Sequence, residues 1–338
     1  MKLRILLAAL LVAAVAGPAF AQDDDAVADA SATVSESVET DDDASEPVPW
    51  TGSTISLRTA TSAISTSEAA ELSFNPYTEL SLTLAPRWRF TDVWSVSAQQ
   101  SFSRELTNSD WTTRRGETLA GDLSLRGAAS RFVTIPGAEI GVSADLALQF
   151  PTSKTSRART LVMGIGPGIS LSRSVDVLAG MRFGYGLRGT YYWHRYTTGE
   201  YRRPYIDGCT TDCGQYLTTG VRNPVWRLSN AFSFGLAFID ELSLGMSYAI
   251  ITDPLHDTVT TEFVSLTPQT PTDTRFTNSF DVNLSYAPID LMSFTLGANT
   301  TNAQLAVDGE RRTPLFNRYT ILYFDVAFDL GAPFNRGG

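Results

Sequence analysis

The chain has 338 residues, of which 43% are hydrophobic and 18% charged, with 36 Asp and Glu against 26 Lys and Arg and a formal charge of −10. This length allows one large domain or two ordinary ones, and this apolar content excludes a chain that is disordered throughout. Past residue 21 no apolar run approaches the ~20 residues that a membrane helix needs, which excludes a helical membrane protein.

The N-terminus has the pattern of a secretory signal peptide. Residues 1–4 are a short basic start, residues 5–16 an apolar stretch, and residues 19–21 a small-x-small cleavage site. No Cys follows the cleavage site, so no lipoprotein anchor is indicated. We expect residues 1–21 to be removed and the mature chain to be exported.

Residues 22–50 are predicted to be an acidic disordered segment. Positions 22–47 hold ten acidic and no basic residues, whereas the rest of the mature chain holds 26 acidic and 24 basic ones. Such a segment cannot bury enough apolar surface to order itself, so we expect a solvated extension. The alternative is a role in binding cations or docking a partner. Most of the net charge therefore says nothing about the partners of the folded part.

Alternation with a period of two runs through residues 51–330 and predicts β-strands. In residues 161–171 and 177–187, large apolar side chains alternate with Gly, Ser and Arg, a set that cannot form a close-packed core. The apolar face must then be the outer one, and the medium outside it lipid. The strands are expected at residues 53–61, 77–90, 93–103, 118–126, 139–150, 161–171, 177–187, 224–238, 242–251, 275–286, 291–299 and 320–330.

Short and long connections between these segments alternate along the chain. The predicted fold class is therefore an all-β, transmembrane, antiparallel up-and-down β-barrel of about 12 strands, with 10–14 allowed, and a short tail at residues 331–338. Two features fit less well. Pro86 and Pro167 remove ladder donors inside strands, which predicts bulges or irregular pairing, and the connection at residues 127–137 is too long for a tight turn.

The signal peptide, the alternating strands, the two kinds of connection and the Trp and Tyr residues near strand ends together resemble bacterial outer-membrane β-barrel proteins of the porin-like kind. The resemblance covers roughly residues 51–330. It implies an outer-membrane location with short turns and both termini in the periplasm, and long loops outside the cell. It also implies contacts with outer-membrane lipid, lipopolysaccharide and the barrel-assembly machinery, and none with nucleic acid. The chain departs from the usual aromatic C-terminus, because Phe334 stands four residues before the end.

Small residues dominate the inward positions of the predicted strands, with charged residues scattered among them. A barrel of this size is wider than the eight-strand type that side chains fill, so water should enter unless a loop plugs it. The arginines either form a positive strip along a pore or pair with carboxylates and brace the wall, and we favour the second interpretation. The pore-lining candidates are Arg87, Arg89, Arg126, Arg182, Arg188, Arg227, Arg275, Asp122, Asp145 and Asp281.

The longest predicted loop, residues 190–223, is rich in aromatic residues and arginine. It is either a constriction or binding patch, or an outer aromatic girdle that continues into Arg residues facing lipopolysaccharide, which we favour. Cys209 and Cys213 lie there in a Gly-rich stretch, and in an exported protein such a pair predicts a loop disulfide rather than a metal site. The loop-binding candidates are Tyr192, Trp193, His194, Arg195, Arg202 and Arg203.

Little in the sequence suggests catalysis. His194 and His256 are the only two histidines, and no Gly-x-Ser-x-Gly motif occurs. Asp253, His256 and Asp257 superficially resemble the Asp and His groups at the rims of outer-membrane proteases, but a solvated turn explains them as well. We predict no enzyme activity, cofactor or metal. The expected function is a passive or weakly selective channel for small polar solutes; the alternatives are a non-conducting structural or surface-interaction barrel and, less favoured, an outer-membrane hydrolase.

Overall fold

A computed structural model describes residues 48–63, 77–107, 116–202, 216–257, 272–305 and 309–332. The predicted signal peptide, the acidic run at residues 22–47, both cysteines and Arg203 lie outside these ranges. For residues 201, 202 and 216–219 only the backbone is described.

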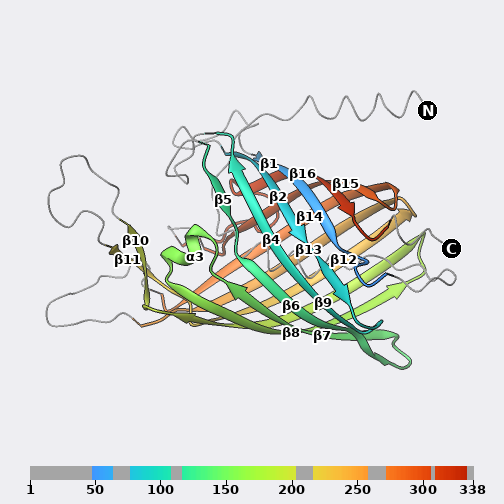
Figure 1. The fold of residues 1–338 in the computed structure, drawn as a ribbon, viewed down its shortest axis with the longest axis horizontal. Helices are drawn as coiled ribbons and strands as arrows, with labels where there is room; N and C mark the ends of the chain where they lie inside the picture. The colour runs from blue at the N-terminus through green and yellow to red at the C-terminus, as the bar shows by residue number, and fades with distance from the viewer. Residues whose placement is uncertain are drawn as a thin grey trace.

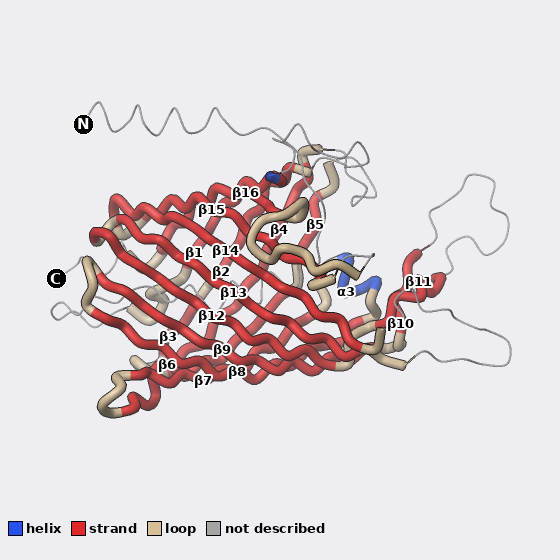
Figure 2. Tube along the Cα trace, turned by 180° about the vertical axis from the view of Figure 1, so that it is seen from behind, coloured by secondary structure: helices blue, strands red, loops and turns tan. Residues whose placement is uncertain are grey.

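Within the described residues the chain is almost entirely β-strand, and the strands form one closed antiparallel sheet (Figures 1 and 2). A separate hairpin, β10 (Thr198–Arg202) with β11 (Tyr216–Arg222), extends beyond one end of the barrel, and a short helix, α3 (Lys154–Ala158), lies near the same end. The barrel strands are β1 (Thr54–Ser62), β2 (Thr78–Ala85), β3 (Arg87–Arg89), β4 (Trp94–Glu105), β5 (Thr118–Ala120), β6 (Leu123–Ile135), β7 (Ile140–Phe150), β8 (Leu161–Val175), β9 (Gly180–His194), β12 (Trp226–Ile239), β13 (Leu242–Pro254), β14 (Thr274–Ile289), β15 (Met292–Ala303) and β16 (Thr320–Asp329).

These segments make a ring of 12 strands, which confirms the predicted fold class and the central strand count. β2 and β3 are two halves of one strand that both pair with β4 in the same register, broken at Pro86, where the sequence predicts an irregularity. β5 and β6 are likewise two halves, and their register against β4 shifts by one residue across residues 121–122. Around Pro167 the pairing of β8 with β9 keeps one register and has no bulge, but Gly166 and Pro167 have no partners in β9, so the pairing is interrupted there, as one of the two predicted irregularities.

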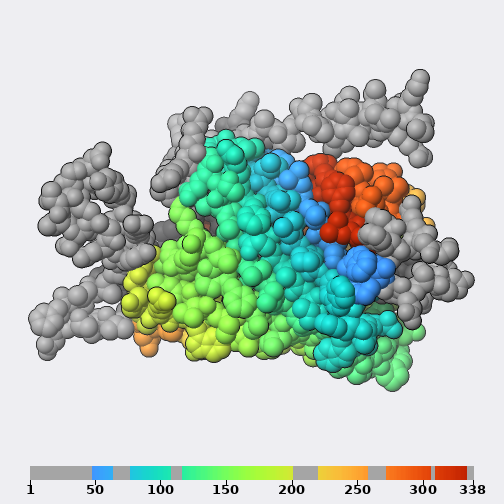
Figure 3. All heavy atoms as spheres, viewed as in Figure 1, coloured from blue at the N-terminus to red at the C-terminus, as the bar shows by residue number. Residues whose placement is uncertain are grey.

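The ring closes where the first and last strands meet. Thr54 pairs with Asp329 and Ser62 with Ile321, and every residue of β1 between them has a partner in β16. In the space-filling view the red C-terminal strand lies directly beside blue β1 (Figure 3). β1 begins and β16 ends at the barrel end that carries the short turns, and the strand ends joined by the long connections lie at the other end, as predicted.

Three local expectations are wrong, and two of the errors come from a register shift that disturbs the alternation. Residues 127–137 are not a long connection: β6 runs on to Ile135, and a register shift of two residues after Ala129 hides the strand in the sequence. Residues 190–194 are not loop but the end of β9. A further shift between Leu161 and Met163 turns Leu161 inward, where it is buried, although the alternation places it outside.

Candidate pore-lining wall and mouth

Register pairs define the inner face of the barrel. Residues directly opposite one another in an antiparallel pair point to the same side of the sheet. Tracing these pairs around the ring puts a band of Gly, Ala, Ser, Thr and charged side chains on one face, the inner wall. The other face carries large apolar side chains that remain exposed, among them Trp88 at 48%, Phe232 at 51% and Leu284 at 43%. This distribution is the one that lipid outside and water inside require.

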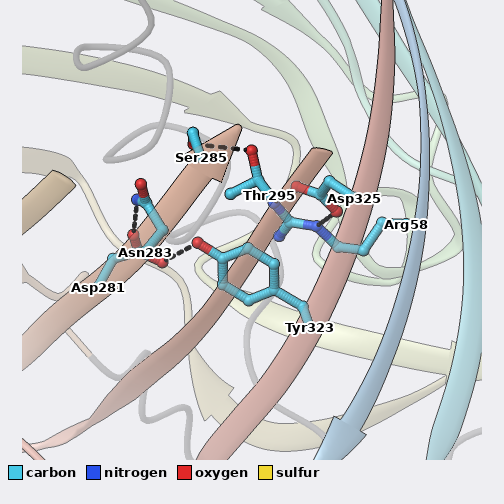
Figure 4. A network of polar contacts seen from close by, with 7 residues as sticks. All are labelled: Arg58, Asp281, Asn283, Ser285, Thr295, Tyr323 and Asp325. Carbon is cyan, nitrogen blue, oxygen red and sulfur yellow. Dashed lines mark hydrogen bonds and ion pairs between the residues drawn. The ribbon is translucent and has the colours of Figure 1, made fainter. Parts of the chain in front are cut away.

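One polar cluster, the seam network, joins β1, β16 and β14 (Figure 4). The Arg58 guanidinium donates two hydrogen bonds of 2.7 Å to the two oxygens of Asp325, and its carbon lies 4.1 Å from the centre of the Tyr323 ring. The Tyr323 hydroxyl donates to Asp281 at 2.8 Å, and Asn283 Nδ2 donates to the other oxygen of Asp281 at 2.7 Å. Arg58 is thus paired with Asp325, and Tyr323 links this pair to the second carboxylate, Asp281.

Gly297 makes the seam network possible. Tyr323 is on β16 and Asp281 on β14, so the ring has to cross β15, which lies between them. At the crossing point β15 carries Gly297, and a Cβ added there would overlap the Tyr323 ring and hydroxyl. The ring consequently lies flat against the wall rather than standing into the lumen.

A second cluster, the basic network, joins β6, β7 and β9. Arg126 Nη2 lies 2.8 Å from one carboxylate oxygen of Asp145, and Arg188 Nη2 lies 2.7 Å from the other. Arg188 also donates a hydrogen bond of 3.1 Å to the Gly166 carbonyl. The side chains of Arg188 and Asp145 are only 7% and 6% exposed. A Cβ at Gly168 on the intervening β8 would come within 2.9 Å of Asp145 and 3.3 Å of Arg188. Glycine again lets long side chains lie along the wall.

The two networks face each other across the barrel. In the ring order, β1 and β9 are six places apart among 12 strands and so stand on opposite sides. Arg58, Asp281, Asp145 and Arg188 all lie near the middle of their strands. The seam network holds two aspartates and one arginine, and the basic network two arginines and one aspartate. Their contacts join strands no more than two places apart and run along the wall rather than across it.

Nearer the long-connection end, Arg227 of β12 and Asp253 of β13 form a buried ion pair. Nε and Nη2 of Arg227 meet the two carboxylate oxygens at 2.8 and 3.0 Å, and the guanidinium lies 5.9 Å from the Tyr192 ring centre. Both oxygens of Asp253 are thus engaged. The resemblance of Asp253, His256 and Asp257 to a catalytic group therefore has no support in the geometry, because Asp253 braces the wall.

Asp122 anchors a loop. It sits at the break between β5 and β6 and accepts hydrogen bonds from the Ser153 backbone at 2.7 Å, from Gln149 at 2.8 Å and from the Ser156 hydroxyl. Ser153 caps α3 by accepting from the Ser156 backbone at 3.0 Å. The connection after β7 is held by these bonds against the long-connection end of the wall.

The other pore-lining candidates also sit at inward register positions. Arg87 donates to Ser95 at 3.3 Å at the short-turn end, and Arg89 follows it on β3. Arg182 is opposite Gly235 on β12, and Arg275 is opposite Asp253 on β13. Among the candidate arginines, Arg126, Arg188 and Arg227 pair with aspartates in the described part of the chain, as the second interpretation of the wall predicts.

The loop-binding candidates whose side chains are described, Tyr192, Trp193, His194 and Arg195, do not share one face. Tyr192 and His194 belong to β9 and point inward, while Trp193 between them is exposed and packs edge-on against Tyr191 at 5.1 Å. The Arg195 backbone donates to the Thr160 carbonyl at 2.9 Å, and Arg202 ends β10.

Sequence reasoning missed three wall residues: Arg58, Glu105 and Tyr323. Arg58 could have been found, because it alternates with Ile55 and Leu57 in the weak first strand. Glu105 is the last residue of β4 and is buried, but it falls beyond the predicted end of that strand. Tyr323 could also have been found, because it alternates with Leu322 and Phe324 in the last predicted strand.

In the described part of the chain no helix is long and apolar enough to cross a membrane. Within the same residues, no group of three or more His, Cys, Asp or Glu side chains is placed to hold a metal ion.

No family model and no curated protein matches this chain. Among solved structures, the COG4313 outer membrane channel from Pseudomonas putida F1 superposes with a TM-score of 0.51 at 11% identity, over 86% of this chain and 99% of that one. The NanC porin gives 0.43 at 12% identity over 82% and 100% of the two chains, and the KdgM porin in complex with disordered oligogalacturonate gives 0.39 at 8% over 82% and 99%. The chain thus has the fold of porin-like bacterial outer-membrane β-barrels.

Proposed function

We propose that the protein is a passive or weakly selective outer-membrane channel for small polar solutes, with both termini in the periplasm. The observation that supports the proposal is that the polar contacts of the inner wall run along the wall and not across the lumen. Arg188, Asp145 and Tyr323 lie across neighbouring strands over glycines and do not reach towards the opposite side. A wall built in this way keeps long polar side chains out of the axis, whereas a barrel with a packed interior needs them there.

Single-channel recording in a planar bilayer tests the proposal. The mature protein, folded in detergent and checked by circular dichroism, is expected to give steady open steps in symmetric KCl. A barrel that is correctly folded yet electrically silent would overturn the channel proposal and leave the non-conducting surface barrel.

The two networks supply a matched pair of variants for the same recording. Asp281→Asn removes a negative charge from the seam network, and Arg126→Gln removes a positive charge from the basic network, whose Asp145 keeps Arg188. Under a KCl gradient the reversal potential should move in opposite directions in the two variants, towards anions in the first and towards cations in the second. Unchanged potentials in both would mean that ions do not pass between these networks.

A further inference from the structure

The only two histidines of the chain meet at the long-connection end of the barrel. His194 is the last residue of β9 and His256 follows β13, yet their ring centres lie 6.1 Å apart with the planes at 90°. The contact comes from the ring order, in which β9 and β13 are separated only by β12.

The proton on the His194 ring can be placed from its hydrogen bond. Nδ1 lies 2.8 Å from the Arg159 carbonyl, and because a carbonyl only accepts, Nδ1 carries the proton. Nε2 then presents a lone pair, and this atom is buried with no hydrogen-bond partner. The Pro224 carbonyl also lies beside the ring, but it is another acceptor and cannot satisfy that lone pair. Histidines that bind metals are usually held in this way, with the second ring N–H on a backbone carbonyl.

Asn223 supplies a second acceptor without a partner. Its side chain is buried, with 1% of the residue exposed, and Nδ2 donates to the Arg159 carbonyl at 2.8 Å and to the Tyr196 carbonyl at 2.9 Å. Both amide protons are thus used, which fixes the orientation of the amide and leaves Oδ1 unpaired. Asn223 and His194 share one acceptor and are therefore neighbours. The His256 backbone donates to the Asn223 carbonyl at 2.9 Å, which keeps the second ring at the same place.

We propose that His194 Nε2 and the His256 imidazole bind a divalent transition-metal ion of the zinc type, with Asn223 Oδ1 as a third ligand or as the acceptor for a metal-bound water. A cation can satisfy such unpaired acceptors, and imidazole nitrogen favours zinc, copper and nickel over magnesium and calcium. Zinc–nitrogen bonds of about 2.0–2.1 Å bring two ligand rings slightly closer than they are here, so a small rotation of His256 completes the site.

The surrounding charges permit a cation. Arg227, which shares the mouth of the barrel with His194, is neutralised by both oxygens of Asp253 at 2.8 and 3.0 Å. Asp257 is next to His256 in the chain and exposed. A metal here ties the chain after β9 to the chain after β13 at the barrel mouth.

Zinc titration of the mature protein in detergent tests the site, and it needs no conduction, so it can fail or succeed independently of the channel proposal. The protein carries Cys209→Ser and Cys213→Ser, which prevents thiolates from binding zinc. After treatment with a chelator, isothermal titration calorimetry with zinc chloride should show one site. His194→Gln and His256→Gln should each weaken that site by more than about tenfold.

His256→Gln is the decisive variant, because His256 lies outside the strands and is partly exposed, so its loss leaves the barrel intact even if His194→Gln does not fold. If the parent protein binds no zinc, or if zinc binding is unchanged in His256→Gln, the site does not exist. Binding that persists in both variants belongs to the acidic run at residues 22–47 and equally overturns the proposal.

Discussion

Gly297 offers the sharpest test of how this wall is built. In the variant Gly297→Ala the added methyl group would occupy the space of the Tyr323 ring, which is itself buried. The ring must then leave β15, and the hydrogen bond of 2.8 Å from its hydroxyl to Asp281 is lost. A hydrogen bond to a charged group contributes about 1.5–3 kcal/mol to stability. The Arg58–Tyr323 contact at 4.1 Å adds about 0.5–1 kcal/mol.

We therefore expect Gly297→Ala to lower the free energy of unfolding by about 2–4 kcal/mol. The assay is reversible urea unfolding in detergent micelles, followed by tryptophan fluorescence. Gly189→Ala is the matched control, because Gly189 also lies within a strand and a Cβ there would have nothing within 4 Å. Gly189→Ala should change the free energy of unfolding by no more than about 0.5 kcal/mol.

A double-mutant cycle separates the clash from any general intolerance of alanine in β15. In a Tyr323→Ala background there is no ring to displace, so Gly297→Ala should cost little there. Equal losses in the two backgrounds would refute the argument that glycine holds the ring flat. Tyr323→Phe keeps the ring and removes only the hydroxyl, so it should lose only the part of the stability that comes from the hydrogen bond to Asp281.

Three further outcomes are expected. Asp253→Asn leaves the buried Arg227 guanidinium without its counter-charge and should destabilise the barrel by about 3 kcal/mol in the same urea assay; a loss below 1 kcal/mol contradicts this. Cys209 and Cys213 should resist alkylation until a reductant is added, and ready labelling of the native protein would exclude the disulfide. N-terminal sequencing of the exported protein should begin at Gln22; an intact leader would disprove the cleavage site.

Strand positions are readable from this sequence because lipid forces apolar and small residues to alternate over long segments. The prediction fails where one strand gains residues relative to its neighbour, and at residues 190–194, where β9 continues beyond its predicted end. The two extra residues after Ala129 interrupt the alternation, and this interruption looks like the end of a strand. The single extra residue before Met163 reverses the alternation and puts Leu161 on the inner face. Nothing in the local sequence distinguishes an interruption within a strand from the end of a strand.

The partners of the wall residues could not be predicted in the same way. Arg126, Asp145 and Arg188 are recognisable as inward, but the contact between Asp145 and Arg188 depends on Gly168 lying between them on β8. The register that puts a glycine at that point is set by the whole hairpin. The pairing of the two histidines depends in turn on β12 being the neighbour of both β9 and β13, which is a property of the ring order.

The closure of the ring has a consequence for biogenesis. The guanidinium of Arg58 donates to Asp325, which is 267 residues away in the sequence, and every residue of β1 is paired with β16 around this contact. Such a contact cannot form until almost the whole polypeptide has been delivered, and contacts between distant parts of a chain form slowly. One edge of β1 stays unpaired until β16 has been delivered, so a chain that stops short of residue 320 cannot close the barrel.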